Sequence, residues 1–123
     1  MAYTTHADAE TDIATRATRR LSKRAVTSGP YTLVAADAVD MIVEVTSATA
    51  VTVTLPQDSA ATIAQEVAIP WRQYGAGQIT FAAGTGATLV SRGSVFKSAG
   101  QYAEGVVTKV AANIWLLSGD IAA

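Results

Sequence analysis

Alternation of apolar and polar side chains, interrupted only by Ile42, marks two short segments near the middle of the chain. In residues 41–45 the first, third and fifth side chains are apolar, and in residues 51–55 valine and leucine alternate with threonine. A period of two residues is typical of a strand with one buried face. Because only the polar residues 46–50 separate the two segments, we expect them to pair as a hairpin.

The chain beyond residue 30 continues as short apolar runs separated by turn residues. Further strands are expected over residues 31–34, 67–69, 78–81, 87–91, 101–110 and 114–118. The last two should form a hairpin around residues 111–113, with a bulge at Gly105, and Pro70 should end its strand. Residues 57–65 are expected to be a loop or at most one helical turn. Seven or eight short strands without a fixed repeat predict an all-β fold: a small antiparallel β-sandwich, a jelly roll or a barrel.

The first 28 residues follow another pattern. Ile13, Ala17 and Leu21 recur at helical spacing, but they form a narrow stripe. A short helix of this kind is marginal by itself, and the turn residues Thr27 to Pro30 separate it from the strands. We therefore divide the chain into an extended or partly helical N-terminal arm, residues 1–28, and a β-domain, residues 29–123.

Charge is distributed unevenly between these regions, although the net charge of the chain is −1. Residues 1–28 hold five basic and three acidic residues, whereas residues 29–123 hold four basic and seven acidic residues. The basic residues of the arm are Arg16, Arg19, Arg20, Lys23 and Arg24.

This basic cluster could be a solvated leader, a nucleic-acid contact or a docking segment for an acidic protein surface. No aromatic residue is interleaved with the cluster, which disfavours stacking on bases. We favour docking onto a protein partner, with Ile13 and Leu21 as apolar contacts, because an arm that folds on contact can cover a large surface.

Composition excludes several classes of protein. Half of the residues are hydrophobic and 15% are charged, the reverse of a disordered chain. The absence of cysteine excludes disulfides, thiolate metal sites and thiol catalysis. No apolar run reaches the ~20 residues of a membrane helix, and the first ten residues do not resemble a signal peptide. We therefore expect that the protein does not associate with a membrane and that it assembles in the cytoplasm.

Candidate catalytic and ligand-binding groups are few. The one histidine, His6, lies in the polar leader, whereas a catalytic histidine must be held rigidly. Asp37 and Asp40 would supply only two ligands for calcium, and turn aspartates commonly bond their own backbone. Gly84 and Gly86 precede an expected strand, so they fit a hairpin turn and not a phosphate loop. We predict no enzyme, no cofactor and no metal.

Four aromatic residues could form a sugar-stacking platform, part of the core or a subunit interface. Trp115 lies in a dense apolar strand and is expected in the core. Trp71 and Tyr74 flank a turn and are better candidates for exposure. Because aromatic residues are enriched at interfaces, we predict that Trp71, Tyr74 and Tyr102 lie at a subunit interface.

Six short motifs follow one another in the second half of the chain. They are Thr54–Pro56, Gly77–Phe81, Gly84–Leu89, Gly100–Ala103, Val106–Val110 and Asn113–Asp120. With these motifs, residues 50–121 resemble a β-module of bacteriophage structural proteins, found in the tips of head or tail fibres and in capsid decoration proteins. The resemblance implies a homotrimer and no catalytic residues.

Combined with the basic arm, the resemblance implies a capsid decoration, or cement, protein on the surface of the virion. Its arms would bind the major capsid protein, and three weak contacts on one trimer would give durable attachment. The alternative is a fibre tip or receptor-binding module with glycan affinity at Trp71 or Tyr74. The motifs do not distinguish a head protein from a tail protein.

Overall fold

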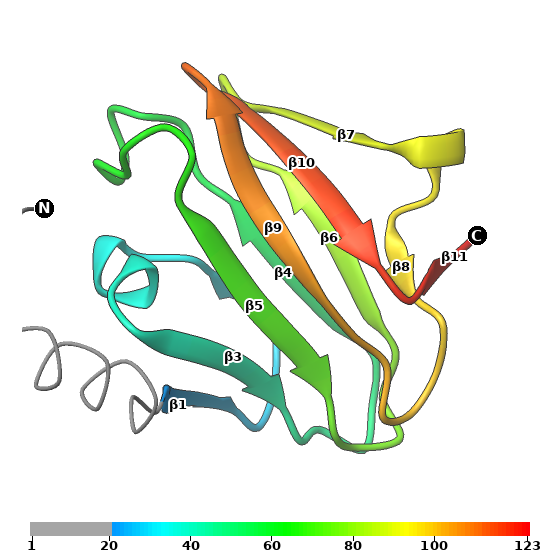
Figure 1. Cartoon of the computed structure of the whole chain (residues 1–123). Coiled ribbons are helices and arrows are strands. Elements are labelled where there is room, and N and C mark those ends of the chain that lie inside the picture. The colour runs from blue at the N-terminus through cyan, green and yellow to red at the C-terminus, as the bar shows by residue number, and fades with distance from the viewer. Residues whose placement is uncertain (1–20) are drawn as a thin grey trace, which may run out of the picture.

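The structure, a computed structural model, describes residues 21–123, and this part of the chain folds into two β-sheets packed face to face (Figure 1). The six-stranded sheet has, in spatial order, β1 (Ser22–Val26), β3 (Met41–Val45), β5 (Ala68–Gln73), β9 (Glu104–Ala111), β10 (Ile114–Gly119) and β7 (Thr88–Ser91). The five-stranded sheet has β11 (Ile121–Ala122), β8 (Lys97–Ser98), β6 (Ile79–Ala83), β4 (Val51–Leu55) and β2 (Tyr31–Thr32). Two short 3₁₀ helices, η1 (Ala35–Ala38) and η2 (Arg92–Ser94), lie in the connections. The predicted all-β fold is confirmed.

The first six strands alternate between the two sheets and pair in parallel, as in a β-solenoid. Ser22 lies beside Met41, 19 residues later, whereas Val43 lies beside Trp71, 28 residues later. The coils therefore differ in length, which explains why the sequence has no fixed repeat. This connectivity is not that of the hairpin-linked sandwich, jelly roll or barrel suggested by the sequence.

The predicted hairpin of residues 41–45 and 51–55 is wrong. Both segments are strands, but β3 belongs to the six-stranded sheet and β4 to the other sheet. Alternation identified the buried face of each strand correctly, since Val43, Val45, Val51 and Val53 are all buried. The polar link 46–50 crosses from one sheet to the other instead of turning back within one.

The C-terminal hairpin is confirmed: β9 and β10 pair antiparallel, and β9 also pairs antiparallel with β5. The bulge lies between Ile114 and Trp115 and not at Gly105, whose register with Gly119 and Trp71 is continuous. Gly105 is needed for close packing instead, because an added Cβ would lie 2.2 Å from the carbonyl oxygen of Ser118 and 2.5 Å from the Trp71 ring.

Pro70 does not end its strand. Successive backbone amides at this end of β5 point alternately toward β9 and toward β3. The amide of Gln73 donates toward β9, to the carbonyl of Ala103, and the amide of Tyr74 donates toward β3, to the carbonyl of Val45. By alternation Pro70 faces the β3 side, where the register begins only at Trp71. The missing N–H of proline therefore costs no ladder hydrogen bond.

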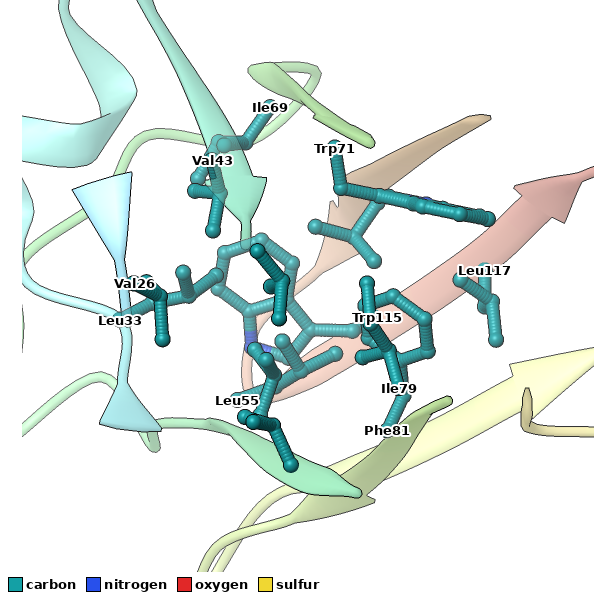
Figure 2. Packing of buried hydrophobic residues seen from close by; sticks show 14 of the residues in the cluster. Val26, Leu33, Val43, Leu55, Ile69, Trp71, Ile79, Phe81, Trp115 and Leu117 are labelled. Carbon is teal, nitrogen blue, oxygen red and sulfur yellow. The ribbon is translucent and has the colours of Figure 1, made fainter. Parts of the chain in front are cut away.

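The core between the sheets is built on aromatic and branched aliphatic side chains from both layers (Figure 2). Trp71 of β5 and Phe81 of β6 pack with ring centroids 5.0 Å apart. The predicted core position of Trp115 is confirmed, and its indole N–H donates to the carbonyl of Pro56 at 3.0 Å.

The boundary proposed at residue 28 moves toward the N-terminus. Residues 22–26, assigned to the arm, form β1 at the edge of the six-stranded sheet and pair with the whole of β3. Val26 is buried in the core. The alternation in this strand is concealed in the sequence by Lys23 and Arg24, which both form ion pairs within the domain.

Candidate binding surfaces

Four connections stack at one end of the domain, and we call residues 27–30, 46–50, 74–78 and 99–103 the loop end (Figure 1). Backbone hydrogen bonds join each connection to its neighbour or to the end of the strand that precedes its neighbour. Thr46 donates to Val26 at 2.9 Å, Gly77 donates to Ser47 at 2.9 Å, and Tyr102 donates to Gln73 at 2.6 Å. The loop end is therefore a hydrogen-bonded layer that continues the sheets.

Glycine permits this close stacking. A Cβ at Gly75 would lie 2.5 Å from the carbonyl oxygen of Ser47, and one at Gly77 would lie 2.0 Å from that of Thr49. Ser47 is buried, and its hydroxyl accepts a hydrogen bond from the amide of Thr49 at 3.1 Å. No other residue type would allow the connections to approach so closely without displacement of the backbone.

Buried polar side chains support the loop end from below. The Ser98 hydroxyl donates to the side-chain oxygen of Gln73 at 2.5 Å and accepts the amide of Ile79 at 2.9 Å. The Gln73 amide donates to the carbonyl of Gly75 at 3.1 Å, and Gln78 donates to the carbonyl of Ser98 at 2.8 Å. A satisfied buried network of this kind rigidifies the backbone that it holds.

Two tyrosines project from the loop end. Tyr74 is 54% exposed and Tyr102 is 65% exposed, and their rings meet edge to face with centroids 5.6 Å apart. Tyr102 has φ of 71°, a left-handed conformation that is uncommon for a bulky residue. The Gln101 side chain donates to the Tyr74 carbonyl at 3.1 Å and ties the two connections together.

The prediction that Trp71 lies at a subunit interface is wrong, because Trp71 is buried in the core of its own chain. Period-two alternation along β5 places Ile69, Trp71 and Gln73 inward and Tyr74 just beyond the strand. The structure does bring Tyr74 and Tyr102 together on the surface.

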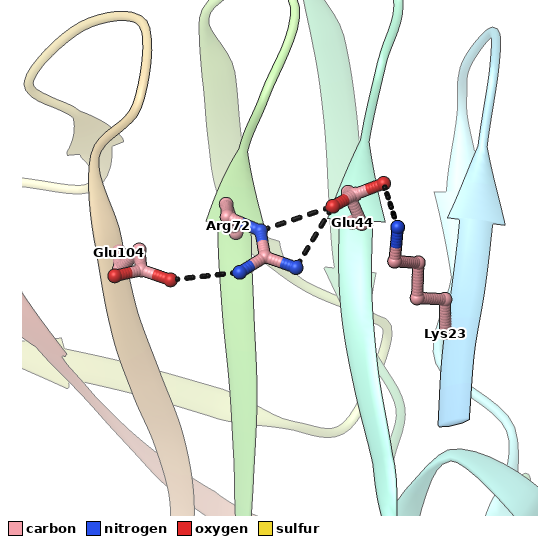
Figure 3. A network of polar contacts seen from close by, with 4 residues as sticks. All are labelled: Lys23, Glu44, Arg72 and Glu104. Atoms are coloured by element: carbon pink, nitrogen blue, oxygen red, sulfur yellow. Dashed lines mark hydrogen bonds and ion pairs between the residues drawn. The ribbon is translucent and has the colours of Figure 1, made fainter. Parts of the chain in front are cut away.

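A charged row crosses the outer face of the six-stranded sheet near the loop end (Figure 3). Its members are Lys23, Glu44, Arg72 and Glu104, one each from β1, β3, β5 and β9. Arg72 donates to Glu44 at 2.8 Å and 3.0 Å and to Glu104 at 3.1 Å, and Lys23 lies 3.5 Å from Glu44. The two cations and two anions neutralise one another.

Two uncharged rows occupy the same face farther from the loop end. Ala68, Thr108, Leu116 and Val90 lie side by side across β5, β9, β10 and β7. Pro70, Val106 and Ser118 form the neighbouring row. All seven side chains are at least partly exposed, although Arg92, Val95 and Ile121 form a groove beside Leu116 and Ser118 at the β10 edge of this face.

The residues of the predicted capsid-binding cluster divide into two groups. Ile13, Arg16, Arg19 and Arg20 lie outside the described residues. Leu21, Lys23 and Arg24 are described, and Leu21 is exposed. Both basic residues of this second group are already paired, Lys23 with Glu44 and Arg24 with Asp37.

Asp37 is the centre of a second polar cluster, at the opposite end of β3. Its buried carboxylate accepts the Arg24 guanidinium at 2.7 Å, the Tyr31 hydroxyl at 2.5 Å and the Val34 amide at 3.0 Å. The bond to the Val34 amide is the backbone bond expected of a turn aspartate. The hydrogen bond to Asp37 raises the pKa of Arg24, and burial raises the pKa of Tyr31.

Lys109 is a buried cation that the sequence analysis missed. Its ammonium group pairs with Asp58, donates to the carbonyl of Ile63 at 3.0 Å and lies 5.6 Å from the centroid of the Trp115 ring. The hydrogen bond from Lys109 lowers the pKa of Asp58. Alternation with buried Val107 is the signal that could have placed Lys109 inward.

The charged groups of these clusters are paired with one another within the domain. Within residues 21–123 no three metal-ligating side chains converge, and no helix there is long and apolar enough to cross a membrane. A groove of about 500 Å³ beside β10 is lined by Val95, Leu116 and Ile121, with Arg92 as its one titratable group. One cation in an apolar groove supplies no acid–base pair.

Comparisons with protein-family models, curated proteins and solved structures find no match to this chain.

Proposed function

We propose that this chain is a structural virion protein without catalytic activity, a capsid decoration protein that forms a homotrimer and attaches to the major capsid protein through its N-terminal residues. The observation that carries the proposal is the uncharged outer face of the six-stranded sheet. An apolar sheet face left uncovered in a single chain marks a surface for a partner.

A second copy of the chain is the partner that best fits this face. The uncharged rows contain only aliphatic side chains, proline, threonine and serine, so nothing on them would hold a nucleic-acid phosphate. The adjoining charged row is already neutralised within each subunit. A neighbouring subunit could therefore bury these rows without desolvating an unpaired charge, provided that Arg92, which lines the groove beside Leu116, stays in contact with solvent.

Capsid attachment is assigned to residues 1–20. Lys23 and Arg24 form ion pairs within the domain. We therefore take Arg16, Arg19 and Arg20 as the basic residues that would contact the capsid. These three arginines with Ile13 suit an acidic protein surface with an apolar recess. Three such segments on one trimer would bind together much more tightly than one.

The trimer is tested by light scattering coupled to size-exclusion chromatography. The wild-type chain should have three times the monomer mass, and Leu116→Glu should reduce it to a monomer with unchanged circular dichroism. Thr52→Glu is the matched control, an exposed strand position on the other sheet, and should stay trimeric. A monomeric wild type, or a trimeric Leu116→Glu variant, would reject this subunit contact.

Capsid attachment is tested with purified capsids and deletion of residues 1–20, which leaves β1 intact. The truncated chain should remain trimeric and fail to co-sediment with capsids. An Arg16/Arg19/Arg20→Ala variant should lose most of the binding, whereas Lys97→Ala, at an exposed β8 position, should retain it. Full decoration by the truncated chain would refute the role of these residues.

A fibre tip or receptor-binding module remains the second candidate, and the exposed tyrosine pair is the observation that favours it. Immuno-electron microscopy of whole particles separates the two, because a decoration protein should label the capsid surface and a fibre tip should label its extremities.

A further inference from the structure

We propose that the loop end is a binding site for a neutral saccharide, with Tyr74 and Tyr102 as the stacking platform and Gln101 as the hydrogen-bonding group beside it. The inference rests on the geometry of the loop end alone and does not depend on the capsid decoration role. Its tyrosines lie on connections beyond the uncharged rows assigned to subunit contact.

Aromatic rings exposed in pairs are suited to sugars. The apolar C–H face of a pyranose packs on the negative π face of an aromatic ring, and the tyrosine hydroxyls remain available to sugar hydroxyls. Tyr74 and Tyr102 meet edge to face, so they present surfaces at an angle of 73° to one another. Gln101 uses one N–H on the Tyr74 carbonyl, which leaves its oxygen and a second N–H for a ligand.

The absence of charge selects the class of saccharide. None of residues 27–30, 46–50, 74–78 and 99–103 is charged. Recognition of phosphate, sulfate or carboxylate groups generally uses arginine or lysine, and the nearest arginine on the outer face, Arg72, is paired with Glu44 and Glu104. A neutral polyhydroxyl ligand is the chemistry that remains.

The loop end is poorly suited to a protein partner. Protein interfaces have an apolar, tightly packed centre, whereas the side chains of the loop end larger than threonine are only proline, glutamine and tyrosine. Leucine, isoleucine, valine, phenylalanine and methionine are absent from it. Two aromatic rings among small hydroxyl and methyl groups offer stacking area without such a centre.

The site is preorganised. Tyr102 is held at positive φ by the hydrogen bond from its amide to Gln73 and by the bridge from Gln101 to Tyr74. Backbone strain of this kind persists where the surroundings enforce it and clusters at ligand sites. The buried Ser98–Gln73 bond lies directly beneath, at the end of β5, so little conformational freedom is left to lose on binding.

The test uses the full chain on an array of neutral oligosaccharides of glucose, galactose, mannose and N-acetylglucosamine, printed beside sialylated and sulfated counterparts. We expect binding among the neutral probes, with affinity unchanged between 50 mM and 500 mM salt as for an uncharged ligand. Titration calorimetry with the best neutral probe then compares variants. Tyr74→Ser and Tyr102→Ser should each weaken binding by about threefold to tenfold, the scale of one lost stacking contact.

Matched variants separate stacking from folding. Tyr74→Phe keeps the ring and should retain most of the affinity, and Val39→Ser removes an exposed apolar side chain outside the loop end and should change nothing. Leu116→Glu should bind the probe as wild type does, whether or not the trimer forms. Binding confined to acidic probes, no binding to any neutral probe, or wild-type affinity in both serine variants would overturn the proposal.

Discussion

Replacement of Gly105 by alanine should destabilise the domain, because the structure leaves no space for the added methyl group. Gly105 sits in β9 with Trp71 of β5 on one side and Gly119 of β10 on the other. The new Cβ would lie 2.2 Å from the Ser118 carbonyl oxygen and 2.5 Å and 2.8 Å from two atoms of the Trp71 ring. One neighbour is sheet backbone and the other is a buried indole, so neither can move away easily.

The size of the effect follows from this geometry. Ordinary contact begins at 3.4 Å, so β10 or the indole must shift by about 1 Å, and overpacking of this kind costs typically about 1–3 kcal/mol. The loss of glycine flexibility in the unfolded chain offsets about 0.4–1 kcal/mol. We therefore expect a net loss of about 1–2 kcal/mol, which lowers Tm by roughly 4–8 °C in a domain of this size.

The measurement is urea unfolding followed by tryptophan fluorescence, since Trp71 and Trp115 are both buried. Gly100→Ala is the matched control, because a Cβ at Gly100 meets no atom within 4 Å and should leave stability unchanged or slightly raised. Gly105→Ala should cost less stability in a Trp71→Phe background than in the wild type, by the part of the loss that the indole causes. Equal stabilities of Gly105→Ala and Gly100→Ala would refute the packing described here.

Three further predictions concern buried polar groups. Lys109→Ala should lower the free energy of unfolding, measured in urea, by about 2–3 kcal/mol, because packing on Trp115 is lost together with the ion pair. The exposed control Lys97→Ala should lower it by less than about 0.5 kcal/mol. Similar values for both variants would contradict the burial of Lys109. Asp37→Ala should lower the free energy of unfolding by about 2–3 kcal/mol in the same assay, because buried donors lose their acceptor. A loss below about 0.5 kcal/mol, as for an ordinary surface substitution, would argue against this cluster. Pairing with Lys109 lowers the pKa of Asp58 in the folded state. The stabilisation that this pair contributes is therefore complete above the pKa of aspartate in the unfolded chain, about 4, and is lost as the pH falls below that value. Thermal unfolding between pH 2 and 7 should therefore show the advantage of wild type over Asp58→Asn shrinking below about pH 4, and a constant difference would count against the pair.

The location of most strands was determined by the sequence itself. Period-two alternation depends only on which side chains leave water, so β3, β4 and the β9–β10 hairpin could be identified without knowledge of their neighbours. The dense apolar run around Trp115 correctly indicated that this side chain lies in the core. Alternation failed at β1, where Val26 is the one buried side chain and the pairing of Lys23 and Arg24 with acidic residues of the domain cannot be read from the local pattern.

Only the tertiary structure decided which strands pair and which polar residues are buried. Alternation is identical for a strand that turns back on itself and for one that crosses to another sheet, so the hairpin of residues 41–55 could not be distinguished from a solenoid coil. The tyrosine pair joins residues 28 positions apart, and Lys109 reaches Asp58 across 51 positions. Such contacts depend on the stacking of coils of unequal length, which no local pattern in the chain encodes.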